Sequence, residues 1–120
     1  MDLAKAIADV KNTPGFADNV GMMLIHNGVV RGWSRQNKAG VTAVEITPDN
    51  AKIQALCEEF QKRPGIFRAT AFCRSGILKP GDDVMYIIVA GDIRENVKSA
   101  LSDLLDRIKN EAVTKREVFA

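Results

Sequence analysis

Basic side chains at three separate places in this 120-residue chain could together bind an anion. The stretch 20–44 contains no Asp or Glu but holds Arg31, Arg35 and Lys38. Arginine offers forked, permanently charged donors, and lysine can also exchange a proton, so both types suit binding and processing of a phosphate or carboxylate-like group. The other basic residues of interest lie at a predicted helix start and near the C-terminus: Arg94, Lys109, Lys115 and Arg116.

Each of these basic groups also has an interpretation without a ligand. Arg35 and Lys38 could form the solvated tip of a loop. Arg94 could pair with a neighbouring acid such as Glu95 instead of binding a ligand at the helix start. Lysine near a helix C-terminus, as at Lys109, is favoured by the helix dipole alone. The local sequence leaves these alternatives open.

His26 is the only histidine, which excludes a metal site built from several histidines. A histidine in an apolar strand is more typically a hydrogen-bonded core or edge residue than a catalyst. Trp33, beside the basic loop, could stack on a flat ring or serve as packing. Cys57 and Cys73 form neither a C-x-x-C unit nor a disulfide framework, so we interpret them as buried thiols in a reducing cytosol. The sequence predicts no metal and no cofactor.

Length and composition indicate one globular domain, with 46% hydrophobic and 27% charged residues. The formal net charge of +2 argues against general nucleic-acid binding, so any anion binding must come from local clustering. The first residues do not resemble a secretion signal, and no apolar stretch is long enough to span a bilayer. We therefore expect a cytoplasmic protein that does not bind membranes.

The elements that must position the N-terminal basic residues follow from hydrophobic spacing. Residues 2–11 carry apolar residues at helical spacing and predict a short amphipathic helix. Residues 20–31 read as a long strand, 32–40 as a polar loop and 41–46 as a second strand. The two strands are predicted to form a hairpin around the basic loop.

The second half of the chain predicts two helices and three more strands. Thr47 is the expected N-cap of a helix with Pro48 in its first turn, and its apolar face and end are clear from the sequence. Strands are expected at 67–73 and 115–119, and the apolar stretch 84–90 is typical of a central strand covered on both faces. Asp92 and Glu95 resemble a capping pair for a helix that runs to about residue 109. In the helix that begins at Thr47, the apolar face comprises Ile53, Leu56, Cys57 and Phe60, and Arg63-Pro64-Gly65 follows the helix.

These elements predict an α+β fold in which a mostly antiparallel sheet carries helices packed on one face. We expect a single domain over residues 1–120, with an N-terminal helical segment at 1–17. No repeat, low-complexity segment or interdomain linker interrupts it.

Several motifs occur in an order and spacing that resemble a known family. They are residues 26–31 (His-Asn-Gly-Val-Val-Arg), residues 76–83 (Gly-Ile-Leu-Lys-Pro-Gly-Asp-Asp), Arg94 with the long helix to Lys109, and Lys115-Arg116-Glu117. Over about residues 20–117 the chain resembles the large, catalytic subunit of molybdopterin synthase. The resemblance implies an α/β-hammerhead-like fold for residues 18–120.

The resemblance also implies a function in molybdenum cofactor biosynthesis. Enzymes of this family transfer sulfur from the thiocarboxylated Gly-Gly tail of a small ubiquitin-like carrier to a cyclic pyranopterin monophosphate. By resemblance, Lys109 and Lys115 would be catalytic. The substrate-binding residues would be Arg31, Arg94, Arg35 and Arg116. The family has a histidine immediately before the helix arginine, where this chain has Ile93.

Helix geometry adds a hypothesis about assembly. Arg94 and Lys109 are separated by roughly 22 Å on one unbroken helix, since each residue adds about 1.5 Å. One small pterin cannot contact both, so a shared site predicts a homodimer in which each site draws residues from both subunits.

Two other functions are compatible with the sequence. The chain could be a non-catalytic dimeric homologue that binds the pterin, another anion or the carrier, because isoleucine at position 93 cannot transfer a proton. It could also be an RNA- or nucleotide-binding module that uses the basic loop. Steep salt dependence with polynucleotide would support that last function, and the small net charge argues against it.

Overall fold

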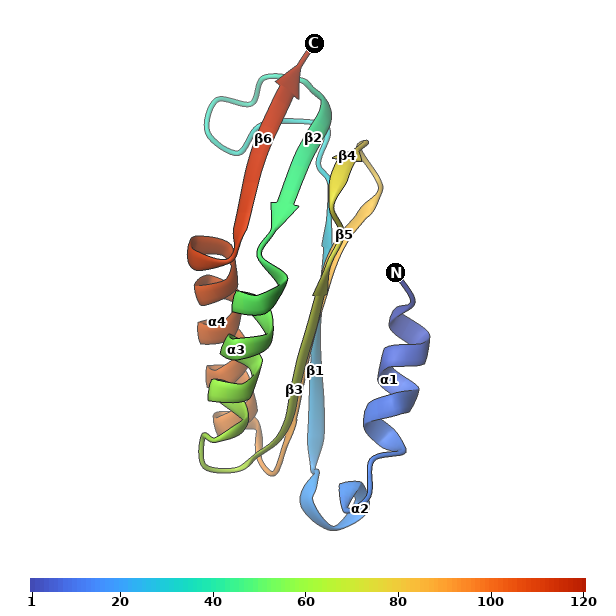
Figure 1. Cartoon of the computed structure of the whole chain (residues 1–120), viewed down its shortest axis with the longest axis vertical. Helices are drawn as coiled ribbons and strands as arrows, with labels where there is room; N and C mark the ends of the chain where they lie inside the picture. Colours follow the sequence, from blue (N-terminus) through green and yellow to red (C-terminus); the bar gives the residue numbers. More distant parts are fainter.

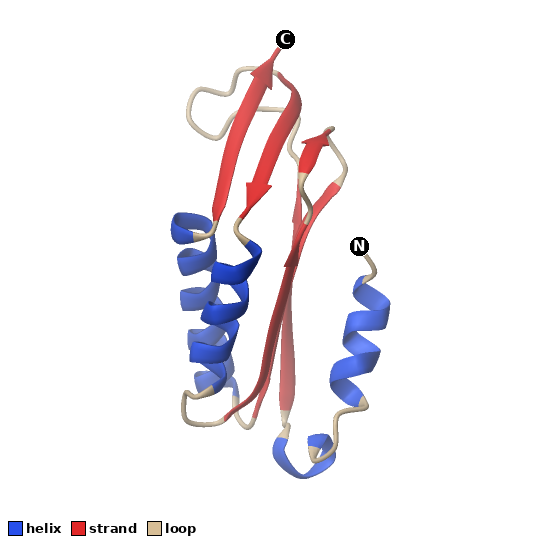
Figure 2. Ribbon diagram, in the orientation of Figure 1, coloured by secondary structure: helices blue, strands red, loops and turns tan.

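The computed structural model describes residues 1–120, an elongated molecule of 50 × 25 × 24 Å. Figure 1 and Figure 2 show its helices flanking long strands, with a smaller group of strands at one end. Two short elements, α2 and β4, were not predicted. In chain order the elements are α1 (Leu3–Lys11), α2 (Phe16–Asn19), β1 (Met22–Val29), β2 (Val41–Pro48), α3 (Asn50–Gln61), β3 (Ile66–Cys73), β4 (Gly76–Leu78), β5 (Asp83–Gly91), α4 (Arg94–Glu111) and β6 (Val113–Phe119).

The strands form two antiparallel sheets, ordered β1-β5-β3 and β4-β2-β6. The predicted α+β class is confirmed. As expected, α3 and α4 pack together on one face of the first sheet. The N-terminal helix α1 lies against the opposite face, where Val10 packs with Ile88 and Ala90.

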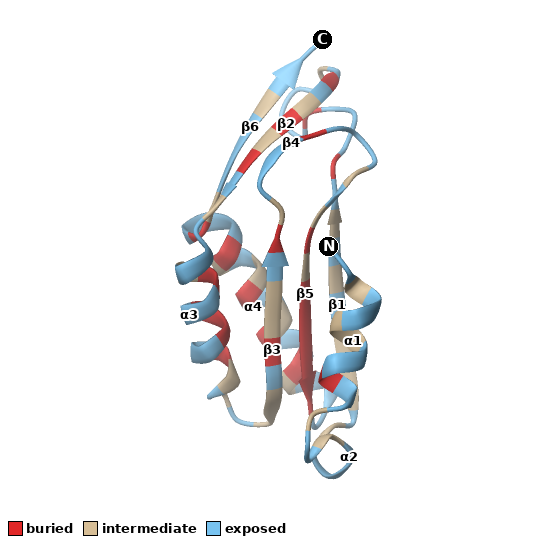
Figure 3. Ribbon diagram, turned by 45° about the vertical axis from the view of Figure 1, so that its right-hand side comes forward, coloured by how far each residue is buried: buried red, intermediate tan, exposed pale blue.

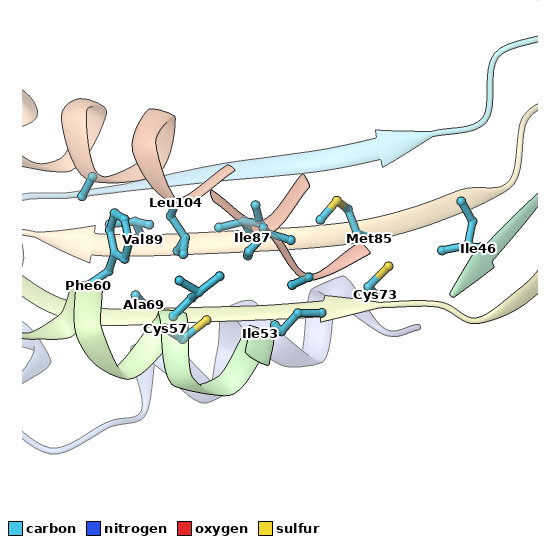
Figure 4. Close-up of a cluster of buried hydrophobic side chains, with 14 of the residues drawn as sticks. Ile46, Ile53, Cys57, Phe60, Ala69, Cys73, Met85, Ile87, Val89 and Leu104 are labelled. Atoms are coloured by element: carbon cyan, nitrogen blue, oxygen red, sulfur yellow. The ribbon is translucent and has the colours of Figure 1, made fainter. Parts of the chain in front are cut away.

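Strand β5 is the centre of the first sheet and is covered on both faces, as its apolar sequence predicted. Ile87 and Val89 face the main core, whereas Ile88 and Ala90 alternate with them toward α1. Figure 3 shows this strand buried along most of its length. Figure 4 shows side chains from α3, α4 and both sheets meeting in the main core, so both sheets contribute to one hydrophobic cluster.

The predicted hairpin between the first two strands is wrong. β1 pairs with β5, so that Ile25 lies opposite Ile88, whereas β2 pairs with β6, so that Glu45 lies opposite Arg116. The apolar β5 needs a neighbour on each edge to be buried, and β1 and β3 take these positions. The loop between β1 and β2 therefore connects two different sheets.

The starts of the two long helices also differ from the prediction. Asp49, not Thr47, caps α3: its Oδ1 accepts a hydrogen bond from the backbone N–H of Lys52 at 3.0 Å, and Pro48 ends strand β2. At α4 the N-cap position belongs to Ile93, which has no capping side chain. Asp92 lies one residue too early, so its carboxylate accepts hydrogen bonds from Asn96 and from the N–H of Ile93, and these lower its pKa.

A close backbone contact at the end of β5 makes a testable prediction about stability. A Cβ at Gly91 would lie 2.5 Å from the carbonyl oxygen of Gly65 and 2.8 Å from a methyl group of Val97. We expect Gly91→Ala to lower the free energy of unfolding by about 1–3 kcal/mol, because backbone must shift. A Cβ at Gly40 would meet only Ala120, at 3.9 Å, so Gly40→Ala is the matched control. Equal midpoints for the two variants in chemical denaturation would contradict the prediction.

Candidate functional site

A cleft of about 790 Å³ lies between the two sheets, next to the C-terminal end of α4. Its walls come from segments far apart in the sequence: β1 and the residues that follow it, β2, β5, the last turn of α4, and β6. In Figure 1 this region is where the upper sheet meets the long strands. The tertiary fold therefore assembles the cleft from both halves of the chain.

The charged lining of the cleft is predominantly basic. Four of the residues that the sequence singled out line it, namely Arg31, Arg35, Lys109 and Lys115. Glu117 is the only carboxylate in the wall. None of the four cations takes part in an ion pair within the chain. Uncompensated positive charge in a concave surface attracts anions, so the cleft is suited to an anionic ligand.

The α4–β6 junction fixes the two lysines. Lys109 lies in the last turn of α4, and Lys115 follows a tight turn into β6. Arg107 Nη1 lies 2.9 Å from Glu59 Oε2 of α3, and Lys52 Nζ lies 3.3 Å from Glu111 Oε1, so two ion pairs hold this helix end against α3. The lysines therefore project from an anchored corner and not from a free terminus.

Strand alternation decides which residues of β6 reach the cleft. Lys115 and Glu117 lie on the face toward it. Arg116 points to the other face, where its guanidinium lies 3.5 Å from the Glu45 carboxylate. The single chain thus does not bring Arg116 into the cleft.

Trp33 organises the basic residues after β1. The guanidinium carbon of Arg31 lies 4.8 Å from the centre of the indole ring, and the ammonium of Lys38 lies 5.1 Å from it. Such cation–π contacts stabilise a cation by about 0.5–1 kcal/mol when the site is exposed. The indole therefore orients Arg31. The sequence left open what Trp33 stacks on, and in the structure its ring contacts cationic side chains of the same chain.

Glu117 was missed as a cleft residue, although it shares the strand face of Lys115. Ser34, the only buried polar residue, donates a hydrogen bond from Oγ to Glu117 Oε1 at 3.3 Å. Ser34 Oγ in turn accepts a hydrogen bond from the backbone N–H of Gln36. Ser34 thereby connects the loop after β1 to β6 across one wall of the cleft. The alternation of side chains along 115–117 could have revealed this position.

Arg94 lies outside the cleft, at the other end of α4. Its side chain is 78% exposed and makes only a 3.4 Å contact with the Glu95 carboxylate, the alternative that the sequence left open. The adjacent Ile93 is also exposed. Because α4 is one continuous helix of 18 residues, Arg94 and Lys109 of the same chain cannot contact one small ligand.

His26 reaches the cleft from β1, and its environment differs from the expected one. Its Nε2 atom is buried and has no hydrogen-bond partner. Burial, and secondarily the charge of Lys109, lower the pKa of the imidazole below 6.5. The expectation of a hydrogen-bonded histidine is therefore wrong for this atom.

The two cysteines are buried and unbridged, as predicted. Burial raises the pKa of the Cys57 thiol to about 11 and raises that of Cys73 as well. Both thiols are thus protonated at neutral pH and poorly nucleophilic, so a cysteine nucleophile does not fit this site.

The sequence pattern of the MoaE protein family matches residues 1–111, which is most of the chain and includes the N-terminal helical segment. The chain belongs to the MoaE family. The MoaE family comprises large subunits of molybdopterin synthase. The role of this family is in molybdenum cofactor biosynthesis.

A curated relative agrees with the family assignment. A probable molybdopterin synthase of Haloferax volcanii is 30% identical over 61 residues, which cover 51% of this chain and 23% of the relative. The chain thus matches about a quarter of the length of that relative.

Molybdopterin cofactor biosynthesis protein E of Burkholderia multivorans superposes with a TM-score of 0.76 at 22% identity, covering 100% of this chain and 85% of that one. A chain from a complex of subunits 1 and 2 of the molybdopterin-converting factor of Helicobacter pylori gives a TM-score of 0.70 at 16% identity, covering 98% and 80%. At these identities the two structures establish a shared fold. This chain shares with other MoaE structures a framework of antiparallel sheets with packed helices.

No helix of this chain is both long and apolar enough to cross a membrane.

Proposed function

We propose that this MoaE chain is a sulfurtransferase that converts a cyclic pyranopterin monophosphate to molybdopterin. The observation that carries the proposal is the cleft with four basic side chains free of ion pairs and a single carboxylate. Family membership supports the same reaction.

The reaction requires such a cleft on electrostatic grounds. A thiocarboxylate and a phosphate ester are both anionic, and at 4 Å two unit charges repel by about 4 kcal/mol at an effective dielectric constant of 20. Fixed cations between them remove this repulsion and stabilise the charge that develops during the reaction. Arg31, Lys109 and Lys115 are held in place for this by Trp33 and by the anchored α4–β6 corner.

The four basic residues of the cleft then have proposed roles. Lys109 is the central catalytic residue at the tail of the carrier, and Lys115 is the second lysine of the same pocket. Arg31 and Arg35 bind the phosphate and the pterin through forked, charge-assisted hydrogen bonds. Arg116 has no role in the cleft of one chain, because it faces away.

The partner of this chain is proposed to be a small ubiquitin-like sulfur carrier with a C-terminal Gly-Gly. The Helicobacter pylori relative occurs in a complex of subunits 1 and 2. Two glycines carry no side chain, so an extended Gly-Gly tail can enter a narrow polar cleft and present its terminal sulfur to the lysines.

We further propose a homodimer in which the exposed Arg94 of one subunit completes the cleft of the other. Arg94 and Ile93 are exposed at the end of α4 remote from their own cleft. Only a second copy can place an Arg94 side chain beside Lys109, because the continuous helix keeps the two apart within one chain.

The direct test is sulfur transfer from a thiocarboxylated carrier to the cyclic pterin, with molybdopterin as the measured product. We expect product to form with the chain and not without it. If the chain binds the carrier but gives no product, it is instead a binding homologue, as the isoleucine at position 93 would suggest. If no carrier binds at all, the proposed function is wrong.

A further inference from the structure

The single histidine of the chain occupies a wall of the basic cleft. His26 lies opposite Ile87 of the central strand β5, which fixes its backbone. A Cβ at Gly28 would lie 3.3 Å from His26 Nε2, so the glycine leaves the space in which the ring sits. The imidazole is thus built into the sheet and is not a mobile surface group.

The unpartnered nitrogen indicates that the ring has a role beyond packing. Buried polar atoms of proteins almost always have a hydrogen-bond partner, and leaving one without costs about 1–3 kcal/mol. His26 Nε2 is the only buried side-chain nitrogen or oxygen atom without a partner here. This atom is shielded from solvent, so a partner can reach it only when the ring or the cleft wall moves as a ligand binds.

The surroundings of His26 keep its imidazole neutral. Besides His26, the charged or titratable groups that line the cleft are Arg31 and Arg35 after β1, Lys109 of α4, and Lys115 and Glu117 of β6. β2 and β5 contribute only apolar side chains to it: Val44, Ile46, Val84 and Met85. Burial first and the Lys109 charge second lower the pKa of His26, so one ring nitrogen is free to accept a proton at neutral pH.

No other group of the cleft is as well suited to accept a proton. Lysine and arginine side chains are hydrogen-bond donors and offer no acceptor atom when charged. The carboxylate of Glu117 already accepts a hydrogen bond from Ser34. His26, the only imidazole of the chain, lies among these cations and is therefore the best proton acceptor in the cleft.

We propose that His26 is a catalytic residue that accepts a proton from water during sulfur transfer; this rests on the proposed function. The proposed step starts from the thioester that links the carrier's carbonyl carbon to a sulfur atom on the pterin. The water oxygen bonds to the thioester carbonyl carbon, and the carbon–sulfur bond to the carrier breaks. Its electron pair stays on the sulfur, now a pterin thiolate. One water proton goes to His26, and the other leaves the new carrier carboxyl group for solvent.

The first test compares the wild type with His26→Gln in single-turnover sulfur transfer across pH. Glutamine keeps a polar side chain but cannot take up the proton, so we expect the rate at neutral pH to fall by about 100-fold. The wild-type rate should fall as the pH drops through the His26 pKa, below 6.5, because only neutral imidazole accepts a proton. The rate of His26→Gln should not show this decrease at low pH. A His26→Gln rate and pH profile equal to the wild type would overturn the inference.

The second test does not require turnover. His26 gives the only histidine ring signals in an NMR spectrum, so its titration is unambiguous. We expect a pKa below 6.5 in the free chain, an increase in Lys109→Ala, and a change in the ring signals when a carrier with an ordinary carboxylate tail binds. If the carrier binds, as shown by calorimetry, and these signals stay unchanged, the inference is wrong even where sulfur transfer succeeds. Failure of the wild type to form product would instead contradict the proposed function.

Discussion

Lys109→Ala is expected to abolish most sulfur transfer while leaving the fold intact. Removing one fixed charge or proton donor from such a site typically costs about 10²–10³ in rate. The side chain is exposed and in no ion pair, so the expected loss of stability is only the helix-dipole contribution of about 0.3–1 kcal/mol. The measurement is the single-turnover rate of molybdopterin formation, with thermal unfolding to verify the fold.

Two further variants separate the possible roles of Lys109. Lys109→Arg keeps the positive charge but cannot release a proton at neutral pH. A purely electrostatic role predicts partial activity for this variant, whereas a role in proton transfer predicts a loss as large as for alanine. Lys62→Ala is the matched control, because Lys62 is an exposed lysine at the C-terminal end of α3, outside the cleft. If Lys62→Ala and Lys109→Ala lose activity equally, the assignment of Lys109 is wrong.

The second large effect is expected from mixing two inactive variants. If each site takes Lys109 from one subunit and Arg94 from the other, Arg94→Ala and Lys109→Ala are each impaired as homodimers. A mixed dimer has one site with both residues intact and one site with neither. After subunit exchange, random pairing gives half mixed dimers, so about a quarter of wild-type activity should return.

The control for this experiment is the double variant Arg94→Ala/Lys109→Ala mixed with Arg94→Ala, which has no intact site in any pairing. Activity should stay at the level of the single variants. If mixing the two single variants restores nothing, although light scattering shows that mixed dimers form, the site is not shared between subunits. A chain that stays monomeric at the assay concentration would also contradict the proposal.

The sequence alone was sufficient wherever a local pattern decides the structure. The spacing of Leu104 and its neighbours predicted α4, and the near-continuous apolar residues of β5 predicted a strand buried on both faces; both are confirmed. Helix and strand periodicity arise from the residues of one segment, so one segment suffices to read them. The resemblance to the MoaE family likewise came from motifs in order along the chain, and the family match supports it.

Pairing between segments could not be read in this way. β1 and β2 are consecutive in the chain, and a hairpin was the simplest expectation, but each pairs with a strand from the second half. The choice depends on how β5 can be buried, which involves four strands at once. The cap of α3 moved by two residues for a related reason: β2 continues to Pro48 because its partner β6 begins at Val113.

The sequence by itself determined which residue types are present for binding an anion, and it drew attention to Arg31, Arg35, Lys109 and Lys115, which the fold brings to one cleft. Only the tertiary structure decided that Arg116 faces away, that Arg94 lies at the far end of α4, and that His26 joins the cleft without a partner. The physical reason is that residue type is a property of one position. The direction of a side chain, by contrast, depends on strand pairing, and its burial depends on the elements that pack around it.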